Sequence, residues 1–210
     1  MVLVGIFGAG GFGREVLPLV RGRADEVVFV DDAPRASTIN GTRVLNWDEF
    51  CAEAVPKQIV LAVGNSAARQ AIAARCADAG IGFAQVQAAN ALILDEVQIG
   101  EGAVICPFVA ITSNVQIGRH FHANIYSYVA HDCVIGDFVT FAPQVCCNGN
   151  VHIHDHAYIG TGAVLKQGAA EQPLVIGRGA VVGMGAIVTK DVAPGETVVG
   201  NPARPLGAAR

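Results

Sequence analysis

The sequence predicts a protein in two parts, a small α/β domain followed by a three-sided parallel β-helix. Three observations carry this prediction. The 29 valines and 16 isoleucines far outnumber the 10 leucines, and side chains branched at Cβ favour strands over helical cores. Strand-like and helix-like segments alternate over residues 1–88, and from residue 93 the chain repeats every six residues. We therefore place the two domains at 1–88 and 89–210.

The composition excludes several classes of protein. Of the 210 residues, 52% are hydrophobic and 15% are charged, which argues against disorder. The net charge of −4, from 18 acidic and 14 basic residues, argues against a nucleic-acid surface. No apolar run approaches the ~20 residues that span a bilayer, and the start lacks the basic segment of a signal peptide. The six cysteines form no C-x-x-C pair, which indicates reduced thiols. We therefore expect a cytoplasmic protein with no nucleic-acid or membrane partner.

The first domain is predicted to be a parallel sheet with crossover helices. A buried strand is expected at residues 2–7, followed by a glycine-rich turn and a helix that extends to residue 21. Strands at 27–30 and 58–63 end at Asp31-Asp32 and Gly64-Asn65, and a second helix is expected at 67–79. Strands that alternate with helices in this way indicate parallel pairing.

From residue 93 onward, the chain holds an aliphatic residue at nearly every sixth position, in one register from Ile93 to Leu165 and in a second from Ile176 after a break near Glu171-Gln172-Pro173. Ile93, Ile99 and Ile105 are examples, and Ile, Leu or Val occupies thirteen of the seventeen positions of the two registers. The pattern also recurs at eighteen residues, since Val97-Gln98-Ile99-Gly100 returns as Val115-Gln116-Ile117-Gly118. Three six-residue segments per turn predict a triangular coil whose aliphatic residues point inward.

A glycine-rich turn follows the first strand with the spacing Gly8-x-Gly10-x-x-Gly13. Such a turn before a helix fits a phosphate site, and an acidic residue about 20 residues further fits a ribose or base contact. The domain is too short for the two halves of a dinucleotide fold, so one nucleotide fits better than a nicotinamide dinucleotide; a purely structural turn is the alternative. The predicted substrate-binding residues are Gly10, Gly11, Phe12, Gly13, Asp31, Asp32, Gly64 and Asn65.

His131 and Asp132 are the candidates for general-base chemistry. A neutral imidazole can take a proton from an attacking amine or hydroxyl, and an adjacent carboxylate can fix its tautomer. Gly149 lies eighteen residues further on, so it should stack on His131 at the strand spacing of about 4.8 Å, with its N–H available to a developing oxyanion. The alternatives are a solvated turn pair at His131-Asp132 and an ordinary turn at Gly149.

The other histidines are expected on the surface. The run His152, His154 and His156 has the composition of a metal site, but its members fall at positions where a coil turns and side chains point outward. His120 and His122 are likewise expected to be surface residues. We therefore predict no bound metal.

Four motifs carry a resemblance to a known family: Gly8-Ala9-Gly10-Gly11-Phe12-Gly13-Arg14-Glu15, Val30-Asp31-Asp32, Ala62-Val63-Gly64-Asn65, and Val129-Ala130-His131-Asp132-Cys133-Val134-Ile135-Gly136-Asp137. The chain resembles the hexapeptide-repeat acyltransferases, and more narrowly the sugar O- and N-acyltransferases of the sialic acid O-acetyltransferase type. This resemblance implies a Rossmann-like nucleotide-sugar domain ahead of a left-handed parallel β-helix, acetyl-CoA as co-substrate, and a homotrimer. One departure is Phe12, where relatives often carry histidine.

The resemblance also implies roles for single residues. The histidine that matches His131 acts as the base, and the glycine that matches Gly149 contacts the acetyl carbonyl through its amide. Asn124 matches a polar residue that lines the same site. The residues expected to contact coenzyme A are Gly149, Thr161, Gly162, Lys166 and Lys190, with Arg178 and Arg204 as further basic candidates for its phosphates.

Together these features predict an acetyltransferase that moves acetyl from acetyl-CoA to an amino group of a nucleotide-linked amino sugar, in surface polysaccharide biosynthesis. One alternative is O-acetylation of free sialic acid or of another sugar hydroxyl. Another is a trimer that binds sugar nucleotides without catalysis.

Overall fold

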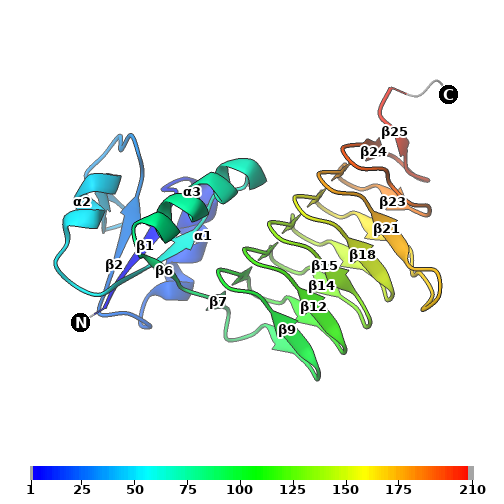
Figure 1. Ribbon diagram of the computed structural model, residues 1–210, viewed down its shortest axis with the longest axis horizontal. Coiled ribbons are helices and arrows are strands. Elements are labelled where there is room, and N and C mark those ends of the chain that lie inside the picture. Colours follow the sequence, from blue (N-terminus) through cyan, green and yellow to red (C-terminus); the bar gives the residue numbers. More distant parts are fainter. Residues whose placement is uncertain (1, 208–210) are drawn as a thin grey trace. The chain divides into compact units, whose positions relative to one another are not determined.

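The computed structural model describes residues 2–207, which fall into two compact units on either side of the bond between Val86 and Gln87 (Figure 1). Unit 1 is an α/β domain, and unit 2 is a coil of short parallel strands. Both parts of the predicted fold class are therefore confirmed. In the described residues, no helix is long and apolar enough to cross a bilayer.

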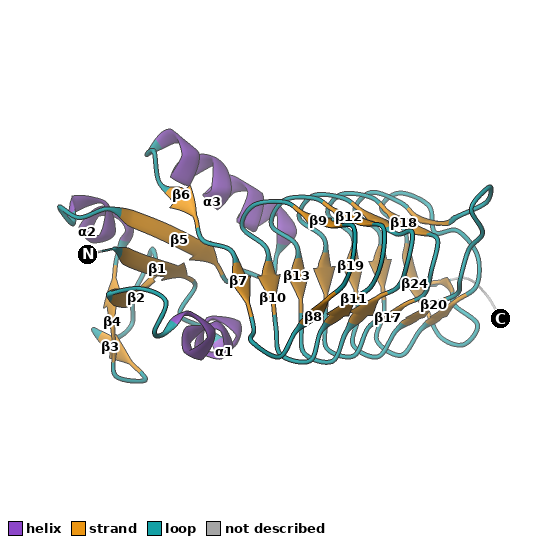
Figure 2. Cartoon of the chain, turned by 90° about the horizontal axis from the view of Figure 1, so that it is seen from below, coloured by secondary structure: helices purple, strands orange, loops and turns teal. Residues whose placement is uncertain are grey.

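Unit 1 contains six strands and three helices: β1 (Leu3–Phe7), α1 (Gly11–Val20), β2 (Glu26–Val30), β3 (Thr38–Ile39), β4 (Thr42–Leu45), α2 (Trp47–Ala52), β5 (Lys57–Leu61), α3 (Ser66–Asp78) and β6 (Gly82–Phe83). The sheet order is β3-β4-β2-β1-β5-β6, and all neighbours are parallel except the hairpin β3-β4. Right-handed crossovers place α1 and α3 on opposite faces of the sheet (Figure 2). The sequence did not predict the β3-β4 hairpin or the short helix α2.

The carboxyl ends of the central strands meet at one edge of this sheet. Phe7, the last residue of β1, pairs with Val30 of β2 on one side and with Leu61 of β5 on the other. The segments that follow all three strands therefore leave from the same edge. In open α/β sheets this edge is where nucleotides bind.

Unit 2 is a left-handed parallel β-helix with three faces. The first face contains β7 (Val86–Gln87), β10 (Val104–Ile105), β13 (His122–Ala123), β16 (Thr140–Phe141), β19 (Tyr158–Ile159), β22 (Val181–Val182), β24 (Thr197–Val199) and the antiparallel β25 (Arg204–Pro205). The second contains β8 (Leu92–Ile93), β11 (Ala110–Ile111), β14 (Tyr128–Val129), β17 (Cys146–Cys147), β20 (Val164–Leu165) and β23 (Ile187–Val188). The third contains β9 (Val97–Ile99), β12 (Val115–Ile117), β15 (Val134–Ile135), β18 (Val151–Ile153) and β21 (Leu174–Ile176).

The predicted repeat sets the register of the coils. Ile111 pairs with Val129 and Val129 with Cys147, so paired residues are 18 apart. The interval becomes 23 between Leu165 and Val188, because residues 167–173 leave the coil as a short excursion. The first positions of the hexads from Ile105 to Val188 are buried, which removes a continuous column of apolar surface from water.

The faces meet at three corners. Corner 1 joins the first face to the second, at residues 106–109, 124–127, 142–145, 160–163 and 183–186. Corner 2 joins the second face to the third, at 94–96, 112–114, 130–132, 148–150, 166–173 and 189–191. Corner 3 joins the third face to the next first face, at 100–103, 118–121, 136–139, 154–157, 177–180 and 193–196. Most corner segments turn through a residue with positive φ, and in neighbouring coils such residues stack 18 apart, as with Asn114, Asp132 and Asn150 of corner 2. The corner 2 segments 166–173 and 189–191 contain no such residue.

The expectation that His120 and His122 lie on the surface is wrong, since each is only 1% exposed. His120 stacks face to face on Phe138 of the next coil at corner 3, with ring centroids 4.9 Å apart. His122 lies on the first face between Val104 and Thr140, which are themselves buried. Stacked coils cover one another at equivalent positions, and a pattern read within one hexad does not contain that contact.

Candidate active site

Corner 2 brings the predicted base and its glycine together. Because Val129 pairs with Cys147, the residues two positions later, His131 and Gly149, lie at equivalent places on neighbouring coils. Asp132 follows His131 and has φ of 58°. Asp and Asn adopt this left-handed conformation more readily than most other residues do. Asp132 therefore suits the backbone of the corner and also places a carboxylate beside the His131 imidazole.

The His131–Asp132 pair has the geometry of an oriented general base. His131 Nδ1 and Asp132 Oδ2 are 2.7 Å apart, and both side chains are about half exposed, at 48% and 47%. A carboxylate can only accept, so we assign the proton of the neutral ring to Nδ1, which leaves the lone pair of Nε2 as the base. The His131 hydrogen bond, with a smaller contribution from Asn114, lowers the pKa of Asp132 and keeps the carboxylate ionised.

Gly149 lies directly under the imidazole. A Cβ built on this glycine would lie 2.5 Å from Cε1 and 2.6 Å from Nε2 of His131, so the ring occupies space that only glycine leaves open. Among residues 2–207, the Gly149 amide donates no backbone hydrogen bond, while its carbonyl accepts one from Gly168. A free donor next to the base is the arrangement that an acyl-transfer oxyanion requires.

One further residue that the sequence reasoning did not single out as a site residue contacts the His131–Asp132 pair, and another lies inside the coil next to it. The Asn114 side chain, one coil earlier, donates to Asp132 Oδ1 at 3.3 Å. Inside the coil, the Cys133 thiol donates to the Asn148 carbonyl at 3.2 Å and lies 3.9 Å from the Cys147 sulfur. Asn114 precedes Asp132 by eighteen residues, and this spacing was the available signal. All six cysteines are free thiols, as expected.

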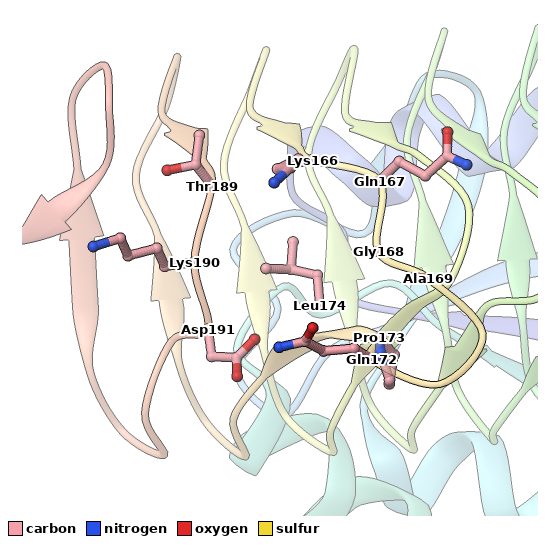
Figure 3. A pocket seen from close by; sticks show the side chains of 10 residues that line it. All are labelled: Lys166, Gln167, Gly168, Ala169, Gln172, Pro173, Leu174, Thr189, Lys190 and Asp191. Atoms are coloured by element: carbon pink, nitrogen blue, oxygen red, sulfur yellow. The ribbon is translucent and has the colours of Figure 1, made fainter.

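The same corner forms a cavity two coils beyond His131. The cavity has a volume of about 440 Å³, and the excursion curves around one side of it while Thr189, Lys190 and Asp191 form the other (Figure 3). It brings Lys166 and Lys190 onto one surface. Neither amine forms an ion pair within the described part of the chain, whereas Arg178 pairs with Asp155 at 3.6 Å. Two free cations along the column that begins at His131 fit the phosphates of coenzyme A.

Three predicted site residues lie at corner 1 instead. Asn124 follows β13, and Thr161 and Gly162 follow β19, two coils further along the same corner. The Asn124 side chain donates to the Phe141 carbonyl at 2.7 Å, which ties one coil to the next. In this chain, the structure therefore does not bring Asn124, Thr161 or Gly162 to His131. The second face separates the two corners.

The glycine turn of unit 1 lies at the carboxyl edge of the sheet, as predicted. A Cβ on Gly13 would collide with the Gly8 carbonyl oxygen, so the close approach of turn and helix requires glycine there. A Cβ on Gly10 or Gly11 would meet nothing within 4 Å, which leaves the backbone of the turn open to a ligand. Phe12 is half-buried beside them. This difference among the glycines is the one a phosphate-binding turn shows.

The two predicted acids have different surroundings. Asp31 lines a cavity of about 470 Å³ together with Gly10, and its Oδ1 accepts a hydrogen bond from the Ala33 amide at 3.0 Å. Asp32 forms a two-pronged ion pair with Arg75, at 2.8 and 3.0 Å, and the Arg75 guanidinium lies 4.1 Å from the Trp47 ring. Asp31 is therefore the acid placed on the cavity.

Gly64 and Asn65 build the start of α3. The Asn65 side chain accepts from the Ala68 amide at 2.9 Å and caps the helix. Arg69 is fully buried and donates to the carbonyls of Val63 and Gly64, and burial lowers the pKa of Arg69 to about 10. These bonds fix the turn after β5.

The run of histidines does not form a metal site in the structure. His154 is exposed, and His156 stacks on Phe138 with centroids 5.3 Å apart. Within residues 2–207, no three His, Cys, Asp or Glu side chains are grouped to hold a metal ion.

The fold and the corner site define an acyltransferase of the hexapeptide-repeat class, and known proteins agree. The model of the PglD N-terminal domain family matches residues 4–76. GDP-perosamine N-acetyltransferase of Escherichia coli O157:H7 is 48% identical over 214 residues, covering 98% of this chain and 97% of that protein. The solved structure of WeeI from Acinetobacter baumannii AYE is 54% identical, with a TM-score of 0.96 over 98% of this chain and 100% of that one. PerB from Caulobacter crescentus, solved with CoA and GDP-perosamine, is 26% identical with a TM-score of 0.88, over 97% of each chain.

This chain belongs to the family of nucleotide-sugar N-acetyltransferases represented by these relatives. It is an acetyltransferase.

Proposed function

We propose that this protein transfers the acetyl group of acetyl-CoA to the amino group of a GDP-linked amino sugar of the perosamine type. The observation that carries the chemistry is the 2.7 Å contact between His131 Nδ1 and Asp132, with Nε2 over Gly149. The names of the relatives support the GDP-linked amino sugar and the coenzyme. Acetylated amino sugars of this kind suit surface polysaccharide biosynthesis.

The proposed reaction begins when the sugar amine attacks the thioester carbonyl. A new C–N bond forms, and His131 Nε2 takes a proton from the nitrogen. Asp132 stabilises the imidazolium that results, while the Gly149 amide donates to the oxyanion of the tetrahedral intermediate. The C–S bond then breaks, the CoA thiolate leaves, and the imidazolium returns the proton to the sulfur. The products are the N-acetylated sugar and free CoA.

We assign the coenzyme to the column of corner 2 that begins at His131. Gln167 and Lys190 occupy the positions that follow His131 and Gly149 on the next coils. Lys166 and Lys190 would hold the phosphates, at the cavity beside the excursion. Ammonium groups that have no protein partner can pair with phosphates without first breaking an ion pair.

We further propose that the working enzyme is a homotrimer whose sites combine corner 2 of one chain with corner 1 of its neighbour. Within one chain, β14 (Tyr128–Val129) separates the two corners, so Asn124 and His131 lie at opposite ends of this strand. Asn124, Thr161 and Gly162 would then face the neighbour's His131 column, with Asn124 at the chemistry and the other two along the coenzyme.

The surface of corner 1 supports this assembly. Phe108 and Tyr126 are each 54% exposed and stack in parallel, with centroids 4.8 Å apart. Ile125 and Met184 on the same corner are 41% and 81% exposed. Apolar side chains gathered on one ridge favour burial against another protein surface, and a second copy of this chain offers the half-buried second face beside His131.

The six free thiols support our expectation that the enzyme works in the cytoplasm. Thiols are oxidised in the periplasm, so export of the protein to the periplasm should lower the yield of active enzyme. An equal yield of active enzyme from both compartments would argue against this expectation.

The decisive test is CoA release from acetyl-CoA across a panel of nucleotide-linked amino sugars, with free sialic acid alongside. We expect turnover with a GDP-linked 4-amino sugar, and none with sialic acid. His131→Ala should lose nearly all turnover while its dissociation constant for acetyl-CoA stays within about threefold, because the imidazole acts on the acceptor proton. Near-normal turnover by His131→Ala would refute the mechanism, and turnover with sialic acid alone would refute the substrate.

The shared site can be tested by mixing two inactive variants. His131→Ala and Asn124→Ala chains, unfolded together and refolded, should form mixed trimers in which some sites pair an intact His131 with an intact Asn124. Activity should then return above that of either variant alone. No recovery in mixed trimers confirmed by mass would refute the shared site.

A further inference from the structure

The cavity at the carboxyl edge of unit 1 contains two arginines that the preceding assignments leave unused. Arg14 comes from the second turn of α1 and Arg35 from the loop between β2 and β3. Both line the cavity of about 470 Å³ that also contains Gly10 and Asp31. Both are exposed.

These two differ from the other arginines of unit 1. Arg21 donates to the Asn40 carbonyl and Thr42, Arg43 pairs with Glu26 and Glu53, Arg69 binds two carbonyls, Arg75 pairs with Asp32, and Arg23 is also in contact with other groups. Among the described residues, the Arg14 and Arg35 guanidinium groups form no hydrogen bond or ion pair. The unpartnered guanidinium groups of the unit are therefore both on one cavity.

The rest of the cavity is suited to a phosphorylated nucleoside. Gly10 is the N-cap of α1, a helix of ten residues with no acidic side chain in its first turn and no side-chain cap. The partial positive charge of that end adds to the two arginines. Pro34, Ile39 and Val44 give the cavity apolar wall, against which a flat base or ribose can pack. Asp31 is the sole acid among its lining residues.

We propose that Arg14 and Arg35 bind the two phosphates of the nucleotide-sugar substrate and make the enzyme selective for diphosphate-linked sugars. This inference rests on the nucleotide-sugar site assigned under Proposed function and adds the residues that recognise the phosphates. The two unpaired positive charges match the two negative charges of a sugar-linked diphosphate. A monophosphate-linked sugar would leave one guanidinium without its partner, and planar guanidinium groups bind phosphate oxygens in pairs of hydrogen bonds.

The test compares the binding of GDP and GMP to the full-length protein by calorimetry, with UDP and UMP as a second pair. The wild type should bind the better diphosphate at least about tenfold more tightly than its monophosphate, since each charge-assisted contact contributes that much or more. Arg14→Gln and Arg35→Gln should each weaken diphosphate binding by about tenfold. In the double variant, the diphosphate and the monophosphate should bind about equally.

Arg43→Gln is the matched control, because it removes the same charge from unit 1 at a different cavity. It should leave the affinity for GDP unchanged. Both proposed arginines are exposed and unpaired, so their replacement should not affect folding. Arg14→Lys and Arg35→Lys keep the positive charge but not the planar guanidinium group. Their affinities for GDP should lie between those of the wild type and of the glutamine variants. Acetyl-CoA binding should be the same in every variant.

Three results would overturn the proposal: wild-type protein that binds neither diphosphate, a double variant that binds GDP within twofold of wild type, or an equal loss in Arg43→Gln. The acetyl-transfer assay separates this outcome from the proposed function. If the wild type turns over and the double variant binds GDP normally, only the role of the arginines is refuted. If GDP binding depends on the arginines but no amino sugar is acetylated, only the proposed function is refuted.

Discussion

Gly149→Ala is the substitution that most directly tests the geometry of corner 2. The added methyl group would lie 2.5 Å from His131 Cε1, where ordinary contact begins at 3.4 Å, so the ring must move by about 0.9 Å. That displacement either lengthens the 2.7 Å bond to Asp132 or moves Nε2 away from the acceptor. A misplacement of about 1 Å at a reacting group costs about 100-fold in rate, and we expect a loss of that size in kcat.

The assay is steady-state CoA release, with the dissociation constant for acetyl-CoA measured separately. Gly82→Ala is the control, because a Cβ there would meet nothing within 4 Å. It should leave kcat unchanged. Thermal unfolding shows whether Gly149→Ala retains the folded β-helix. A folded Gly149→Ala enzyme with kcat within threefold of wild type would refute the argument that this glycine makes room for the base.

Three further substitutions test other parts of the structure. Asn114→Ala removes a hydrogen bond that lowers the pKa of Asp132, the smaller of two such bonds after that of His131, so this pKa should rise. On acidification, the contact between His131 and the ionised Asp132 should then be lost at a higher pH than in the wild type. A carboxyl carbon NMR titration that shows no rise in the pKa of Asp132 would contradict this. Replacing Lys166 and Lys190 together by glutamine should raise KM for acetyl-CoA at least about tenfold, with little change in kcat or in KM for the sugar. An unchanged KM for acetyl-CoA would show that neither lysine binds the coenzyme. Gly13→Ala forces a methyl group against the Gly8 carbonyl and should destabilise unit 1 by about 1–3 kcal/mol in calorimetry. Gly10→Ala, at an open position, should lower the stability of unit 1 much less. Equal losses of stability in the two variants would contradict the crowding argument.

The sequence determined the β-helix because its signal is local and repeated. Every coil needs an inward aliphatic residue from each face, so the hexad register, the 18-residue period and the pairing of His131 with Gly149 all followed from counting. The parallel sheet of unit 1 followed for a similar reason. Its short buried strands end at Phe7, Val30 and Leu61, and parallel strands bring such ends to one edge.

Only the tertiary structure decided how the predicted site residues are divided. The spacing of the sequence placed Asn124 seven residues before His131, but the triangular coil turns between them and puts them on different corners. Asp31 and Asp32 are adjacent in sequence, yet one lines the cavity and the other pairs with Arg75, forty-three residues away. Burial of His120 likewise depends on Phe138 of the next coil. The sequence therefore determined which residue types recur and at what period, because periodicity is a property of the chain. Which side chains meet, and which charges are left for a ligand, depends on contacts between distant segments that only folding creates.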